Sequence, residues 1–175
     1  MSRVINVTLS SAGIDAALQE LYTYKYRIER KAEELRERIA YLIAKDASAV
    51  FNSAVADDLI GEGAITGHVE VSVEPSGDNM TVVIANGKDA VFMEFGAGVY
   101  YNGAVGSSPN PLGTGLGFTI GSYGKGNGRK EVWGYKDGSG VHLTHGTPAS
   151  MPLYKAVQSV LKDIEKIARE VFASD

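Results

Sequence analysis

Glycine is distributed very unevenly along this sequence. Fifteen of the 21 glycines lie between Gly96 and Gly146, and none follows. Because glycine loses more conformational freedom on folding than any other residue, this stretch is unfavourable for helices and strands. The glycines show no period of three, which excludes collagen, and the rest of the chain has an ordinary composition. The sequence therefore predicts a glycine-rich extended arm, residues 97–146, within an otherwise globular domain.

Composition limits the remaining possibilities. The chain has 175 residues, a hydrophobic fraction of 44% and no cysteine, so we expect one domain over residues 1–175 with a buried core. The lack of cysteine excludes a disulfide scaffold, cysteine-ligated metals and thiol catalysis. No stretch is apolar enough to span a bilayer, and the N-terminus does not resemble a secretory signal. We therefore expect no membrane partner and a cytoplasmic location in the cell that makes the protein.

Acidic residues are concentrated in the middle of the chain. Residues 46–95 contain one lysine and nine acidic residues, and the whole chain has a net charge of −4. This balance argues against a general polyanion-binding protein.

A long helical region is predicted over residues 11–55. Ser10 and Ser11 can cap a short helix that ends near Leu21, and a longer helix follows from about Tyr24 to Val55. An apolar stripe at helical spacing predicts packing on the chain's own sheet, with a coiled-coil partner as the alternative. The stripe consists of Leu21, Ile28, Ala32, Leu35, Ile39, Leu42 and Ala49.

Two hairpins are predicted. Alternation of Val69, Val71 and Val73 with polar residues, followed by a returning strand at Met80–Ala85, indicates an antiparallel hairpin over residues 66–86. The apolar run Val82–Ile84 is too continuous for a solvent-facing ribbon. Within the arm, residues 117–123 and 131–135 could pair as a second hairpin.

A C-terminal amphipathic helix is predicted over residues 150–173, with Ser150 as its cap and Pro152 in its first turn. Its predicted apolar stripe consists of Leu153, Val157, Val160, Leu161, Ile164, Ala168 and Val171. The predicted fold class is α+β: a small antiparallel sheet packed by the long N-terminal helix and this C-terminal helix.

Several residues could carry chemistry. His142 and His145, with Glu131 or Asp137, could bind a metal and support a hydrolase, but their extended, glycine-rich setting favours exposed loop histidines. Glu94 lies among apolar residues and could act as a general acid. The favoured interpretation is that Glu94 caps a helix or bonds backbone amides near the turn at Phe95–Gly96. No resident metal or cofactor is expected.

Aromatic and basic side chains on the glycine-rich arm predict contact with a protein partner, because such an arm offers little core of its own to fill. The alternative is a carbohydrate- or cell-wall-binding module that uses Trp133 and nearby tyrosines. The predicted interface residues are Tyr100, Tyr101, Tyr123, Lys125, Arg129, Trp133 and Tyr135. The residues predicted to form the core that supports the arm are Phe92, Phe95, Leu153 and Val157.

Two short motifs give the chain a family resemblance. Glu94, Phe95 and Gly96 form a Glu-Phe-Gly motif that follows Phe92, and a proline-rich segment opens the last helix after the arm. This second motif includes Pro148, Pro152 and Leu153. In these motifs and in element order, the chain resembles the small neck, or tail-completion, proteins of long-tailed bacteriophages and prophages.

The resemblance implies a virion structural protein without catalytic activity. Such proteins form homo-oligomeric rings at the head–tail junction, between the head connector or head-closure protein and the tail-tube or tail-terminator protein. The expected partners are further copies of the chain and these neighbouring ring proteins. Genomic DNA would pass through the channel without specific binding. The expected location is the neck of the virion, and the host cytoplasm during assembly.

Overall fold

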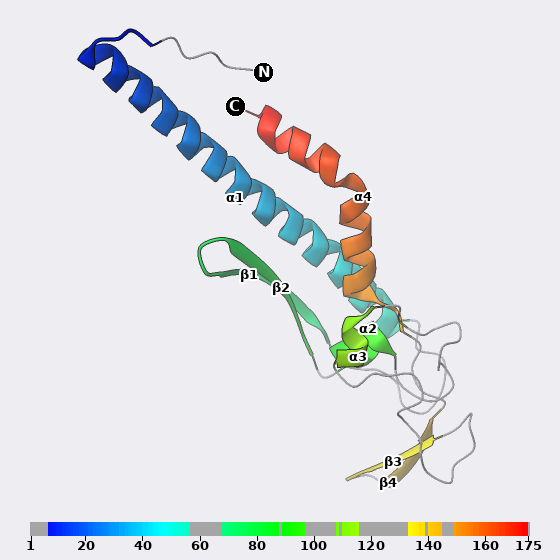
Figure 1. Ribbon diagram of the computed structural model, residues 1–175. Helices are drawn as coiled ribbons and strands as arrows, with labels where there is room; N and C mark the ends of the chain where they lie inside the picture. Colours follow the sequence, from blue (N-terminus) through cyan, green and yellow to red (C-terminus); the bar gives the residue numbers. More distant parts are fainter. Residues whose placement is uncertain are drawn as a thin grey trace.

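A computed structural model describes residues 7–56, 68–87, 89–96, 108, 110–115, 133–138, 140–144 and 149–174. Its elements are α1 (Ser11–Ala56), β1 (Glu70–Ser76), β2 (Met80–Asn86), α2 (Ala90–Phe95), α3 (Leu112–Gly115), β3 (Trp133–Asp137), β4 (Gly140–Thr144) and α4 (Pro152–Ala173). Two long helices and a small antiparallel hairpin confirm the predicted α+β class (Figure 1).

One continuous helix, α1, replaces the two helices predicted for the N-terminal region. Ser10 caps it as predicted, since the Gly13 amide donates to Ser10 Oγ at 3.2 Å. The predicted break near residue 22 is wrong because no glycine or proline interrupts the backbone there. Thr23 accommodates the helix by donating its hydroxyl to the Gln19 carbonyl at 2.8 Å.

The most buried face of α1 differs from the predicted stripe. Leu21, Ile28 and Ala49 are exposed, and the other members of that stripe are only half-buried. Among the described side chains in the C-terminal half of α1, the buried apolar residues are Ala40, Ala44, Ala47 and Phe51. Small side chains let the neighbouring elements approach the helix closely, so the alanines, and not the leucines, form this contact face.

Strands β1 and β2 form the predicted hairpin, with Val71 opposite Ala85 and Val73 opposite Val83. Val71 and Ala85 pack against the main core, and Arg36 of α1 donates to the Asn79 side chain in the hairpin turn at 3.3 Å. The opposite face is exposed: Val82 and Ile84 are 39% and 38% accessible. The expectation that this apolar run is buried is therefore wrong for the face that points away from α1.

The core lies where the end of α1 meets α2, the start of α4 and the base of the hairpin (Figure 1). Its buried members are Ala47, Phe51, Val69, Ala90, Met93 and Ala156. From this core α4 runs back along α1 in the antiparallel direction. Because α1 has 46 residues and α4 only 22, the N-terminal part of α1 extends beyond its partner.

Within the predicted arm, the described residues include α3, β3 and β4. Strand β3 confirms a strand at Trp133 and Tyr135, but it pairs with β4, a hairpin that we did not predict. The sequence Asp137-Gly138-Ser139-Gly140 is a turn signal for this hairpin, and Gly140 has a φ of 139° that other residues rarely adopt. The partner strand predicted at residues 117–123 lies outside the described residues.

Candidate functional site

Glu94 joins the two motifs on which the family resemblance rests. It is on α2 and only 3% exposed. Its carboxylate accepts hydrogen bonds from the backbone amides of Leu153 at 2.8 Å and Tyr154 at 3.0 Å. These amides belong to the first turn of α4, where the helix has no internal acceptors for them. Glu94 therefore caps a helix that begins almost sixty positions later in the sequence.

Of the two roles favoured for Glu94, capping a helix or bonding amides near Phe95–Gly96, the first is confirmed. The cap predicted for α4 is wrong. Ser150 does not cap α4; its hydroxyl donates instead to the Met93 carbonyl at 3.1 Å. The residue at the cap position is Met151, whose side chain makes no capping hydrogen bond. A carboxylate at this position is favourable because the N-terminus of a helix carries a partial positive charge.

A backbone connection lies beside the carboxylate. The Met93 carbonyl accepts from the amides of Ser150 at 2.9 Å and Met151 at 3.1 Å. Together with the bonds to Glu94, these contacts fix the end of α2 against the beginning of α4. We call this group of contacts, made by Met93 and Glu94 with residues 150–154, the motif junction.

Unusual backbone conformations occur on both sides of the motif junction. Gly96 ends α2 with a φ of 77°, and its amide donates to the Phe92 carbonyl at 2.8 Å. This φ explains the glycine of the Glu-Phe-Gly motif. Met151 has a φ of 56°, which is uncommon for a residue with a side chain. The hydrogen bonds of its neighbours to α2 hold the chain in this left-handed turn before Pro152.

Asn110 is part of the site, although it was not among the residues predicted from the sequence. Its side-chain amide donates to Glu94 Oε1 at 3.2 Å. Its side-chain oxygen accepts from the Leu112 amide at 3.1 Å, which forms a local turn at the start of α3. The Asn110-Pro111 dipeptide is a turn signal, but no sequence pattern pairs it with Glu94.

An open apolar groove of about 450 Å³ adjoins the motif junction. Phe95 and Leu153, both motif residues, line it, and so does Val157. The other lining residues are Ala85, Ala90, Val91, Glu94, Asn110, Leu112, Tyr154 and Gln158. The groove therefore lies where both motifs, α3 and the end of β2 meet.

The four residues predicted to form the core beneath the arm, Phe92, Phe95, Leu153 and Val157, are not all buried. Phe92 and Val157 are 38% and 37% exposed, whereas Met93 and Ala156 occupy the core in their place. Phe95 and Leu153 are half-buried, and Leu153 packs against the core as predicted. The short helix α2 turns Ala90, Met93 and Glu94 inward, which leaves Phe92 on the outer side.

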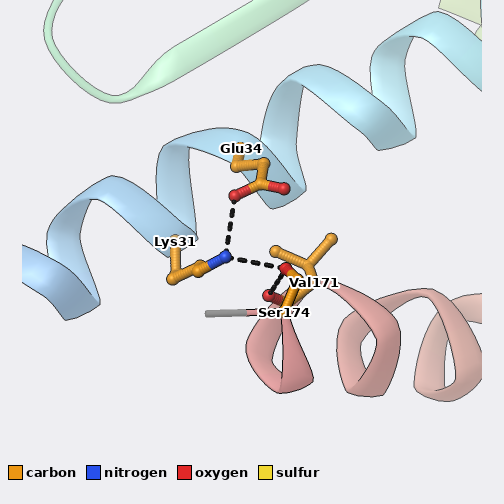
Figure 2. Close-up of polar contacts among 4 residues, drawn as sticks. All are labelled: Lys31, Glu34, Val171 and Ser174. Carbon is orange, nitrogen blue, oxygen red and sulfur yellow. Dashed lines mark hydrogen bonds and ion pairs between the residues drawn. The ribbon is translucent and has the colours of Figure 1, made fainter.

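A buried lysine connects α1 to the far end of α4. Lys31 is 6% exposed, and its Nζ donates to Glu34 at 3.2 Å and to Ser174 Oγ at 2.8 Å (Figure 2). The Ser174 hydroxyl in turn donates to the Val171 carbonyl at 2.8 Å in the last turn of α4. A positive charge at this position is favourable because the carbonyl end of a helix is partly negative.

Most of the predicted arm interface lies outside the described residues, namely Tyr100, Tyr101, Tyr123, Lys125 and Arg129. Trp133 and Tyr135 lie on β3, where Trp133 is opposite Thr144 and Tyr135 is opposite His142. Pro148 lies outside the described residues too.

For the alternative metal site, His142 is on β4 and Asp137 ends β3, while His145 and Glu131 lie outside the described residues. In the described ranges, no three histidine, aspartate or glutamate side chains form a group that could hold a metal. Within the same ranges, none of the helices is both long and apolar enough to cross a membrane.

Comparison with protein-family models, curated proteins and solved structures returned no match for this chain.

Proposed function

We propose that this chain is a head–tail joining protein, of the neck or tail-completion type, of a long-tailed bacteriophage or prophage. It would act as a structural ring component between the head connector and the tail tube and would catalyse no reaction. One observation carries this proposal: the motif junction. The two motifs that resemble the phage family are far apart in the sequence, yet Glu94 and Met93 bind them into one unit.

The motif junction also gives the predicted arm a rigid base. Gly96 precedes the arm, and Ala149 and Ser150 follow it; Ser150 is bonded directly to Met93. Both ends of the intervening segment are therefore held at one place. An aromatic segment anchored at both ends in this way suits a contact with a neighbouring subunit or with the adjacent ring.

The proposed partners are further copies of this chain, the connector or head-closure protein on one side, and the tail-tube or tail-terminator protein on the other. DNA would pass through the ring without sequence-specific contacts, in keeping with the acidic net charge of the chain. The proposed location is the virion neck.

The test uses the phage or prophage that encodes this chain. A nonsense codon early in the gene should leave DNA-filled heads and complete tails that remain separate, counted by electron microscopy of induced lysates. Supplying the wild-type gene in trans should restore joined particles. A normal yield of complete, infective virions without the protein would overturn the proposal. Failure at capsid assembly, before DNA is packaged, would also count against it.

A further inference from the structure

Strand β2 has a free edge. It belongs to a two-stranded sheet, so no strand in the described part of the chain pairs with β2 on the side that faces away from β1. About half of the backbone N–H and C=O groups of β2 point to that side, because these groups alternate in direction along a strand. An edge of this kind is a template to which a further strand can add through main-chain hydrogen bonds.

The two edges of this sheet differ in their protection. Strand β1 contains Pro75, which has no backbone N–H, and the charged residues Glu70 and Glu74. Proline and charged side chains on an edge strand discourage the addition of another strand. Strand β2 contains neither proline nor a charged residue over its seven positions, and its Val82 and Ile84 side chains are exposed. These features favour strand addition at β2 over β1.

The N-terminal segment has the sequence pattern of a strand. Apolar Ile5, Val7 and Leu9 alternate with polar Asn6 and Thr8. Strict alternation that includes β-branched residues is typical of a half-buried strand. Residues 1–6 lie outside the described residues, but Val7 and Leu9 are described and are 52% and 99% exposed. These two members of the apolar row therefore have little cover within their own copy.

This segment cannot reach β2 of its own copy. The turn before β2 lies beside Arg36 of α1, which donates to Asn79, and Ala85 near the other end of β2 packs against the core further along α1 (Figure 1). Arg36 is 26 positions after Ser10, a distance of about 39 Å along a helix. Residues 1–9 span at most about 32 Å when fully extended. A strand formed by these residues can therefore pair along β2 only in another copy.

We propose that residues 3–9 of one copy add as a strand to the free edge of β2 in a neighbouring copy. Main-chain hydrogen bonds hold the added strand, and its apolar row lies beside the exposed Val82 and Ile84. The donated segment and the accepting edge are on different parts of the molecule, so each copy can donate to one neighbour and accept from another. Such a head-to-tail contact closes into a ring when the rotation between neighbours allows it. The inference goes beyond the proposed function and requires only that copies associate.

Engineered cysteines test this pairing, because the chain has none of its own. Opposite residues on adjacent strands lie close enough for a disulfide to form. Val7→Cys is combined in turn with Met80→Cys, Val82→Cys or Ile84→Cys, which samples the registers on this face. After mild oxidation, at least one double variant should give a ladder of covalent oligomers on a non-reducing gel. The single variants should stay monomeric on the gel, since the residue opposite each cysteine is then not a cysteine.

The matched control combines Val7→Cys with Glu74→Cys. Glu74 is opposite Val82 on β1, one strand further from the added segment, so this variant should give no ladder. Dimers of Val82→Cys by itself would indicate that β2 pairs with β2 of another copy and would overturn the proposal. The absence of a ladder from all three double variants would overturn it too.

Deletion of residues 2–7 gives a second measurement on the purified chain. The deletion retains Ser10, the cap of α1, so the midpoint of thermal unfolding by circular dichroism should change by less than about 2 °C. Self-association, measured by sedimentation velocity over a concentration series, should weaken by at least about tenfold. Association that survives the deletion unchanged, or a full-length chain that stays monomeric at the highest attainable concentration, would refute the proposal. Failure to join heads to tails, with this association pattern intact, would refute the proposed function alone.

Discussion

At the scale of single residues, Glu94 uses both of its carboxylate oxygens. Oε2 accepts from the Leu153 amide, and Oε1 accepts from the Tyr154 amide and from the Asn110 side chain. A buried carboxylate is costly unless hydrogen-bond donors surround it, and here three donors do so. A glutamine cannot replace it, since one end of the side-chain amide is itself a donor.

We therefore predict that Glu94→Gln lowers the free energy of unfolding by about 1–3 kcal/mol, the cost of leaving a buried donor unpaired. Urea unfolding monitored by circular dichroism measures this change. The matched control is Glu165→Gln, because the Glu165 side chain is 78% exposed and its ion-pair partner within the described part of the chain is Arg169 on its own helix. Equal stability of the two variants would contradict the capping role of Glu94.

Lys31 provides a second prediction at this scale. Lys31→Met retains the apolar stem but removes the charge at the end of α4, and should cost about 1–2 kcal/mol. Amide hydrogen exchange should increase most in the last turn of α4. Lys25→Met is the control: Lys25 is 70% exposed, its only ion pair in the described residues is with Glu29, and its loss should cost less than about 0.5 kcal/mol. Unchanged exchange near Val171 in Lys31→Met would contradict this role.

At the scale of elements, the sequence predicted that helices exist better than it predicted which face each one buries. The predicted helical regions, residues 11–55 and 150–173, match the ends of α1 and α4 within a few residues, because apolar spacing depends only on the local chain. Within the first region, one helix replaces the two that were predicted. Both helices, however, carry apolar residues over more than one face. Leu21 and Ile28 belong to the regular stripe, yet they precede Lys31, which contacts the end of α4 at Ser174, and both are exposed.

For the candidate site too, local features could be predicted from the sequence, whereas contacts between distant segments could not. The Glu-Phe-Gly motif was recognisable, and the favoured interpretation of Glu94 was that it caps a helix or bonds backbone amides near the turn at Phe95–Gly96. The identity of the capped helix depends on a contact between segments sixty positions apart, and no local pattern encodes such a contact. Asn110 was missed for the same reason. Strand β3 was predicted, but its pairing with β4 depended on a glycine turn within a region already rich in glycine.

At the scale of the whole molecule, the arm can be tested separately from the domain. Deleting residues 117–128 preserves Asn110 and α3, and it shortens the connection between α2 and α4. Loop-closure entropy changes slowly with length, so the free energy of unfolding should change by less than about 0.5 kcal/mol. We predict a folded protein that no longer joins heads to tails in the complementation assay.

The control for this deletion replaces residues 117–128 with a glycine–serine segment of equal length. It should fail in the same assay, since it lacks Tyr123 and Lys125. If the replacement supports normal joining, these side chains are not required, and the arm-interface hypothesis is wrong for this part of the arm.

The contact between Lys31 and Ser174 spans 143 positions in the sequence, and this separation has a consequence for folding kinetics. Helix α1 can form locally within about a microsecond, but α4 can dock only after the intervening chain has closed into a loop. Proteins rich in long-range contacts fold more slowly than helical bundles with short connections. Refolding of this largely helical protein should therefore be limited by the meeting of distant segments, with helical signal gained before α4 reaches its place.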